Sequence, residues 1–175
     1  MNRQTRLDRR QFIAGSAATA AIVITGGALL CRGEAWGLEV HNLKPGTMHT
    51  LIKAARDIYP HDRLEDKYYA IAVRSYDEKA GTDPAMRTLI EDGVAQLDAL
   101  ATATHSQAYA EVAWEEDRAA LLAQAAPGTF FQTLRSGLVV SLYNQREVWR
   151  VFGYEGESAA KGGYLHRGFD DLTWL

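Results

Sequence analysis

The sequence predicts an all-α protein, and three observations support this fold class. Between residues 47 and 152, apolar side chains recur at the three- and four-residue spacing of one helix face. Proline or glycine stands at the ends of several of these periodic segments, where helices stop. No stretch of useful length alternates apolar and polar residues as a half-buried strand would. We therefore expect one small helical domain over residues 47–152.

The helices of this domain can be placed from their end signals. Thr47 and Thr129 are expected to cap the first and last helices, and Pro60 to stop the first. Asp83 followed by Pro84 is a typical cap and first-turn proline. The expected helices are residues 47–59, 64–80, 84–100, 106–113, 115–124 and 129–152, the last interrupted near Asn144.

The charge of the chain argues against nucleic-acid binding. The chain has 175 residues, the length of one domain, and a formal net charge of -3. Residues 1–35 hold five of its 19 basic groups and two of its 22 acidic groups. The remainder therefore has 14 basic against 20 acidic groups, a net charge of -6, and no basic cluster.

The single cysteine and the missing motifs exclude several kinds of chemistry. Cys31 has no second cysteine with which to form a disulfide, and the chain has neither a multi-cysteine zinc site nor a CxxCH haem attachment. GxGxxG after a strand, GxxxxGK[ST] and GxSxG are also absent, and the histidines are not spaced as paired metal ligands. We expect no catalytic residue, cofactor or metal in this chain.

The N-terminal segment resembles a twin-arginine export signal. Arg9 and Arg10 are followed by one spacer residue and then Phe12, and an apolar stretch diluted by glycine and threonine runs on to Leu30. That pathway moves proteins that are already folded, often with a cofactor or a partner bound. Because this chain shows no cofactor motif, the signal suggests that it exports a second protein.

Processing and location follow from the same segment. Residues 33–35, Gly-Glu-Ala, carry small residues at the two positions that a signal peptidase reads. We therefore expect a signal peptide of residues 1–35, cut after Ala35, a linker of residues 36–46 and a periplasmic location. The alternative is a retained membrane anchor, because residues 12–30 come close to the about 20 apolar residues that a span needs.

One short polar segment could carry chemistry. His61 and Asp62 follow Pro60 directly and could form an imidazole–carboxylate pair for acid–base catalysis. The same residues fit an ordinary turn after a helix, in which Asp and His bond the freed backbone groups. The tyrosines of the next helix likewise fit either an aromatic groove or half-buried packing. We favour the turn and the packing interpretations.

The C-terminal segment, residues 153–175, differs in composition from a disordered tail. Its five glycines add backbone freedom that a stable lone helix would have to remove. Aromatic residues, in which disordered tails are poor, recur through the same stretch. We expect an extended arm whose aromatic side chains lie on another surface.

The export signal, the helical body, the segment RDIYPHDRLEDKYYA and the tail FGYEGESAAKGGYLHRGFDD together resemble the gluconate 2-dehydrogenase subunit 3 family. The resemblance covers the chain from about His49 to Trp174. Members of that family are small subunits of membrane-associated dehydrogenases whose large subunit is a glucose-methanol-choline-type flavoprotein that holds FAD. A cytochrome c subunit, carrying haem c, usually takes the electrons. The large subunit commonly has no export signal and crosses the membrane bound to the small one.

The resemblance implies an accessory role for this chain. It would support the folding, stability and export of a FAD-dependent alcohol or sugar dehydrogenase, with the twin-arginine translocase as a transient partner. FAD belongs to the large partner in this view, and the catalytic residues do as well. The residues expected at the interface with that partner are Tyr59, Pro60, His61, Asp62, Trp149, Tyr154, Tyr164, Leu165, Arg167, Phe169, Asp170 and Trp174.

Two other classes of function stay open. An independent periplasmic enzyme would use His61 and Asp62 as its acid–base pair. A membrane-anchored scaffold would keep residues 12–30. The enzyme is expected to be a stable monomer with a closed pocket, whereas the accessory subunit is expected to have a loose arm when alone.

Overall fold

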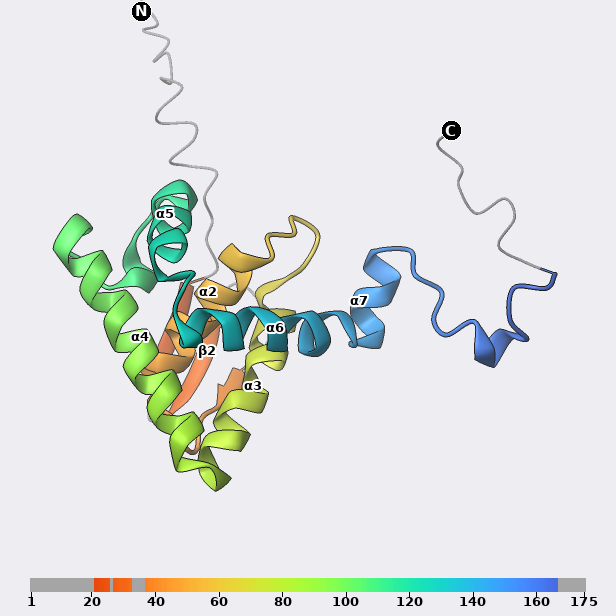
Figure 1. Ribbon diagram of the computed structural model, residues 1–175, viewed down its shortest axis with the longest axis horizontal. Helices are drawn as coiled ribbons and strands as arrows, with labels where there is room; N and C mark the ends of the chain where they lie inside the picture. The colour runs from red at the N-terminus through yellow and green to blue at the C-terminus, as the bar shows by residue number, and fades with distance from the viewer. Residues whose placement is uncertain (1–20, 26, 33–36, 167–175) are drawn as a thin grey trace, which may run out of the picture.

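The computed structural model describes residues 21–25, 27–32 and 37–166 (Figure 1). Six α-helices, three short strands and two 3-10 helices lie within these ranges. The expectation of a mostly helical chain is confirmed. The expected export-signal and interface residues that lie outside the described residues are Arg9, Arg10, Phe12, Arg167, Phe169, Asp170 and Trp174.

The helices form one packed body with an extension at its C-terminal side. Helix α6 crosses the body and leads into α7 at its edge, and from there the chain runs outward (Figure 1). Among the described residues no helix is long and apolar enough to cross a membrane. The helices are α2 (Pro45–Ile58), α3 (Asp66–Thr82), α4 (Pro84–His105), α5 (Glu115–Ala125), α6 (Thr129–Tyr143) and α7 (Arg146–Val151), with 3-10 helices η1 (Tyr109–Glu111) and η2 (Ala159–Lys161).

The expected helix ends are confirmed in part. Asp83 caps α4, because its Oδ1 accepts hydrogen bonds from the backbone N–H groups of Ala85 and Met86 at 2.9 and 3.2 Å. The cap assigned to Thr47 was wrong: α2 begins at Pro45, and the Thr47 hydroxyl donates to Glu91 Oε2 at 2.8 Å.

One expected break in a helix and one expected short helix differ in outcome. The break near Asn144 is confirmed, since α6 ends at Tyr143 and α7 begins at Arg146. The helix expected over residues 106–113 was wrong, because only three of these residues form the 3-10 turn η1. Ser106 ends α4 in the left-handed conformation, with φ of 58°, which turns the chain out of the helical path.

A small antiparallel sheet lies where no strand was expected. Its strands are β1 (Ala21–Thr25), β2 (Ala28–Arg32) and β3 (Gly37–Glu39), in the order β1-β2-β3. Both β1 and β2 lie within residues 1–35, which were assigned to the export signal, and β3 lies in the segment assigned to a linker. Residues 21–31 are nearly all apolar or glycine, and such a run has no alternation that would separate a strand from other buried segments.

The core of the body forms where α3 packs against α2, α4 and α6. Tyr69 and Tyr76 of α3 are 0% and 2% exposed, which confirms their interpretation as packing residues. Glycine permits two close helix contacts, Gly93 of α4 against the Phe130 ring and Gly137 of α6 against the Tyr76 hydroxyl. Other fully buried core residues are Leu51, Ile52, Leu97, Leu134 and Leu138.

Candidate functional site

Four rings meet where α2, α6 and α7 end, and we call Tyr59, His61, Tyr143 and Phe152 the aromatic junction. The His61 ring lies 4.8 Å from Phe152 and 5.6 Å from Tyr143 between centroids, both edge to face. Tyr59 contacts Tyr143 in the same manner at 5.8 Å. The structure thus brings together two residues of the expected interface with two rings from the end of the helical body.

Hydrogen bonds from side chains to backbone carbonyls hold this region in place. The Tyr59 hydroxyl donates to the carbonyl of Arg135 at 3.1 Å, and the Tyr59 carbonyl accepts from the Tyr69 hydroxyl at 2.7 Å. The Tyr143 carbonyl accepts from Trp149 Nε1 at 2.6 Å, which ties α6 to α7 across the break in the helix. The junction is therefore a built feature of the body, and Phe152, 45% exposed, forms its open side.

The surroundings of His61 favour the neutral form of its imidazole. Its Nε2 lies 2.6 Å from the Tyr143 hydroxyl. Partial burial and then the nearby Arg56 cation lower the pKa of His61, and the Asp62 carboxylate opposes them only in part. Burial, followed by the neighbouring Tyr59, raises the pKa of Tyr143. The pair accordingly shares a hydrogen bond between uncharged groups near neutral pH.

The pairing of His61 with Asp62, which the alternative as an independent enzyme needs, is not the one that the structure forms. Within the described residues the hydrogen bond of the His61 side chain goes to Tyr143, whereas Asp62 is exposed at the following turn position. Pro60 is exposed at the same turn. The chain does turn here after the end of α2, as the favoured interpretation has it, but the His61 side chain bonds Tyr143 and not a freed backbone group.

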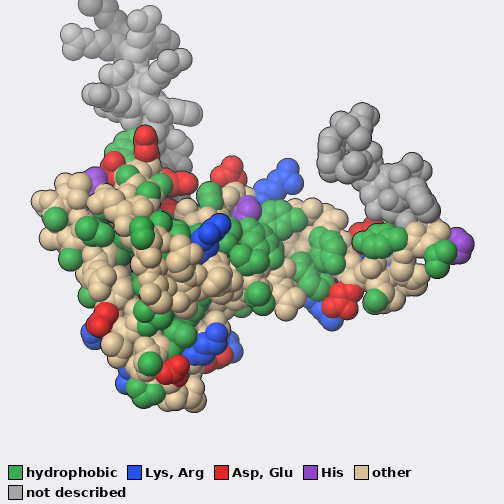
Figure 2. Space-filling model, in the orientation of Figure 1, with side chains coloured by type: hydrophobic (Ala, Val, Ile, Leu, Met, Phe, Trp, Pro, Cys, Tyr) green, Lys and Arg blue, Asp and Glu red, His purple; other side chains and the backbone are tan. Residues whose placement is uncertain are grey.

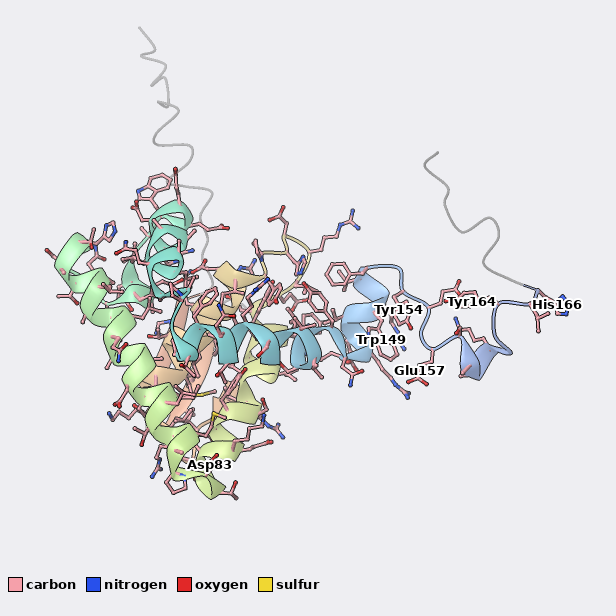
Figure 3. The ribbon with its side chains drawn as sticks, in the orientation of Figure 1. Asp83, Trp149, Tyr154, Glu157, Tyr164 and His166 are labelled. Carbon is pink, nitrogen blue, oxygen red and sulfur yellow. The ribbon has the colours of Figure 1, made fainter. Side chains whose placement is uncertain are left out.

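Trp149 and Tyr154 continue the aromatic surface from α7 into the arm (Figure 3). Their rings lie 5.3 Å apart, edge to face, and the Tyr154 N–H donates to the Trp149 carbonyl at 2.8 Å. A pocket of about 310 Å³ lies beside them, and Arg150 and Glu157 are among its lining residues. An aromatic floor with charges of both signs at its margin resembles the centre and rim of a protein interface.

The described part of the arm, residues 153–166, is largely exposed. Tyr164 and Leu165 are 60% and 80% exposed near its far end, where Figure 3 places Tyr164 and His166. Gly156 and Gly162 have φ of 98° and 81°, a region that only glycine enters without strain, so the path of the arm depends on them. Figure 2 shows several groups of hydrophobic side chains along the C-terminal extension of the molecule.

A second polar cluster, which the sequence did not indicate, lies inside the body. Arg118 of α5 makes two charged hydrogen bonds to Asp57 of α2, at 2.7 and 2.9 Å, and the side chains are 6% and 1% exposed. The Tyr109 hydroxyl donates to Asp57 Oδ2 at 2.6 Å, and burial followed by the Asp57 charge raises the pKa of this phenol. With its groups satisfied and closed to solvent, the cluster joins helices and offers no site for a substrate.

The residues that completed the aromatic junction were not on the list from sequence. Tyr143 lies 82 residues beyond His61, so no local pattern could have paired them. The one available signal was the expected break near Asn144, since a helix that ends there leaves its last ring beside the next helix. Among the described residues there is also no group of three or more His, Cys, Asp or Glu side chains that could hold a metal ion.

Comparisons of this chain with protein-family models, with curated proteins and with solved structures found no match. The resemblance to the gluconate 2-dehydrogenase subunit 3 family therefore stays a prediction. The function has to be argued from the residues and their geometry.

Proposed function

We propose that this chain is the accessory small subunit of a periplasmic FAD-dependent alcohol or sugar dehydrogenase complex. In this role it binds the large flavoprotein subunit through the aromatic junction and the arm, stabilises it and carries it through the twin-arginine pathway. The observation that carries the proposal is the exposed aromatic surface that runs from α7 along the arm.

The amount of apolar surface at this end favours a protein partner. Phe152, Tyr154, Tyr164 and Leu165 are each between 45% and 80% exposed and follow one another along 14 residues of chain. Large exposed apolar patches on a water-soluble protein mark interaction sites, and tyrosine and tryptophan are enriched among the residues that dominate binding energy. Arginine and glutamate beside them suit the polar rim of such an interface.

The hydrogen bonding of the arm favours the same partner role. Among the described residues, the backbone N–H groups of Gly153, Tyr154 and residues 161–163 bond only to carbonyls five or fewer positions earlier in the chain. The arm is thus held by local turns. A segment of this kind takes a fixed course when a second surface supplies the longer-range contacts.

The assignment of FAD to the partner rests on the sequence. The chain has no dinucleotide motif, and the family that it resembles keeps FAD in the large subunit and haem c in a third. An accessory chain with an export signal and no redox group of its own needs such a partner to act in electron transfer.

Co-purification tests the proposal directly. The chain is expressed with its genomic neighbours, purified through a tag, and the visible absorption spectrum of the purified material is recorded. We expect flavin bands and a large second polypeptide at a fixed ratio to the tagged chain. A colourless, fully folded protein that elutes alone would contradict the proposal.

A matched pair of variants locates the binding surface. Tyr154→Ser combined with Leu165→Ser removes two exposed apolar groups of the arm, and we expect it to lower the recovered flavin at least tenfold. Trp114→Ser is the control, because Trp114 is 65% exposed but stands at the start of α5. Equal loss of flavin in both variants would show that the arm is not the specific docking surface.

A further inference from the structure

The hairpin of β1 and β2 supplies a residue to the protein core. Leu29 of β2 is 0% exposed, although its neighbours in the sequence belong to the apolar stretch assigned to the export signal. Its cross-strand partner is Leu38 of β3, 8% exposed, and both belong to the same core cluster as the helices. Both β1 and β2 contact α2. A segment that is discarded after export would not be expected to complete the core of the remaining protein.

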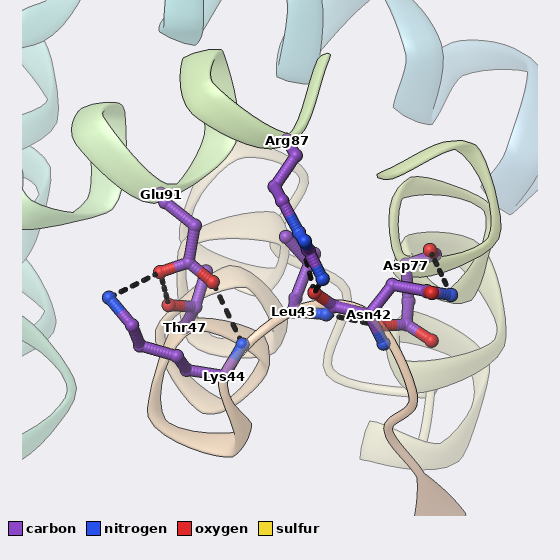
Figure 4. A network of polar contacts seen from close by, with 7 residues as sticks. All are labelled: Asn42, Leu43, Lys44, Thr47, Asp77, Arg87 and Glu91. Atoms are coloured by element: carbon purple, nitrogen blue, oxygen red, sulfur yellow. Dashed lines mark hydrogen bonds and ion pairs between the residues drawn. The ribbon is translucent and has the colours of Figure 1, made fainter. Parts of the chain in front are cut away.

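The sheet is also fastened where the chain leaves it. The Val40 N–H donates to the Gly27 carbonyl at 3.0 Å. This bond joins the residue after β3 to the turn between β1 and β2. The next residues are pinned by two helices: Asp77 of α3 accepts from the N–H groups of Asn42 and Leu43, both at 2.8 Å, and Glu91 of α4 accepts from that of Lys44 at 2.8 Å (Figure 4). The position of β3 is thereby fixed relative to α3 and α4.

A cut after Ala35 would separate β1 and β2 from this fixed strand. It would leave β3, three residues long, without the neighbour that pairs with it, and would uncover Leu38 and the core surface under Leu29. Unpaired strand edges and freshly exposed apolar surface both favour aggregation. We propose that residues 21–32 are a permanent part of the folded protein, and that any proteolytic processing of the chain takes place before Ala21.

The N-terminus of the accumulated protein is the first test. The full chain is expressed with its own leader, purified through a C-terminal tag from the compartment in which it accumulates, and examined by N-terminal sequencing and intact mass. We expect the chain to begin at Met1 or at any residue up to Ala21. A folded, soluble protein that begins between residues 22 and 36 would overturn the proposal.

A matched pair of substitutions in the hairpin is the second test. Leu29→Ala in the same purified protein is expected to lower Tm by about 10 °C, since it empties a fully buried site. Ile24→Ala is the control, because Ile24 lies in β1 of the same hairpin but is 46% exposed, and we expect a change below about 2 °C. No change in either variant would mean that the hairpin is absent from the accumulated protein.

A milder variant covers the case in which Leu29→Ala does not fold. Leu29→Val is expected to lower Tm by about 3 °C while keeping the chain soluble. Neither test requires a partner or flavin, so a failure here leaves the proposed accessory role untouched. Loss of flavin capture with a stable hairpin would count only against that role.

Discussion

Two irregular segments flank the helices, and they are held in different ways. Residues 40–44, before α2, donate backbone N–H groups to carboxylates of α3 and α4 and to a carbonyl of the sheet. Residues 153–163, after α7, bond among themselves and to the last turn of α7. The first segment is fixed by side chains far away in the sequence. In the second, the backbone N–H groups bond to carbonyls no more than five positions earlier, and we propose that a partner supplies the longer-range contacts.

Asp77 is the main anchor of the first segment. Its side chain is almost wholly buried, and it accepts from the N–H groups of His41, Asn42 and Leu43 at 3.1, 2.8 and 2.8 Å. Arg87 of α4 adds a hydrogen bond from its Nε to the Asn42 carbonyl at 2.9 Å. One buried carboxylate therefore replaces the ladder of bonds that a helix or strand would give to this stretch.

The largest effect is expected from removing this anchor. Asp77→Ala leaves three backbone N–H groups without their acceptor, and we expect the free energy of unfolding to fall by about 3 kcal/mol in urea titrations. Glu78→Ala is the control, since Glu78 pairs with Arg74 on the surface of the same helix, and such pairs contribute about 0.5 kcal/mol or less. A similar small loss in both variants would remove the proposed difference between the two segments.

The pH dependence of stability sharpens the same point. Burial raises the pKa of Asp77, but the three N–H donors outweigh it and hold the pKa below its usual value. Because the folded pKa lies below the unfolded one, the stabilisation is complete above the unfolded pKa of about 4 and is lost as the pH falls through the folded pKa. We expect Asp77→Asn to be less stable than the native chain at pH 7. The difference should shrink as the pH falls below about 4, the usual pKa of an aspartate.

These two segments also show what the sequence could predict. The cap at Asp83 and the break near Asn144 are local signals, and both were predicted correctly. The anchors of residues 40–44 were not, because Asp77 lies 34 to 36 residues away and an acidic side chain on a helix gives no sign of its acceptor role. The hairpin was missed for a related reason. A largely apolar stretch such as residues 21–31 suits an export signal as well as a buried strand.

The candidate site also contains residues that local signals predicted and one that they did not. Tyr59 and His61 were expected from the chain step at Pro60, and Trp149 and Tyr154 from the end of the last helix. Tyr143, which bonds to His61 and connects these two parts, could be found only once the fold placed α6 beside the end of α2. Contacts between residues far apart in the sequence could not be predicted from one sequence alone.

Loss of the hydrogen bond in the aromatic junction should have an intermediate effect on the free energy of unfolding. Tyr143→Phe removes the hydroxyl that bonds His61 and keeps the ring contacts, so we expect a loss of about 1 kcal/mol in the free energy of unfolding. Tyr154→Phe is the control, since that ring is part of the arm surface and 49% exposed. Equal stability of Tyr143→Phe and the native chain would mean that the junction is not ordered without a partner.

Protonation of His61 should loosen the junction without any substitution. Partial burial and the Arg56 charge lower the pKa of His61, so its folded pKa lies below the unfolded value of about 6.5. The contribution to stability is present above that value and is lost as the pH falls through the folded pKa. We expect the His61 ring signals in NMR to titrate with a midpoint below 6.5. A midpoint above 6.5 would indicate that a carboxylate, not Tyr143, is its partner.

The smallest change in stability is expected from deleting the arm. The backbone hydrogen bonds of the described arm reach only α7 or the arm itself, so we expect removal of residues 153–175 to keep Tm within about 2 °C and the helical circular dichroism nearly unchanged. Flavin capture from co-expressed neighbours should nevertheless be lost. Such a result would show that the arm is anchored on a partner and not on this chain. If the deletion instead lowered Tm by as much as Asp77→Ala, the arm would have its contacts on this chain, and the contrast between the two segments would fail.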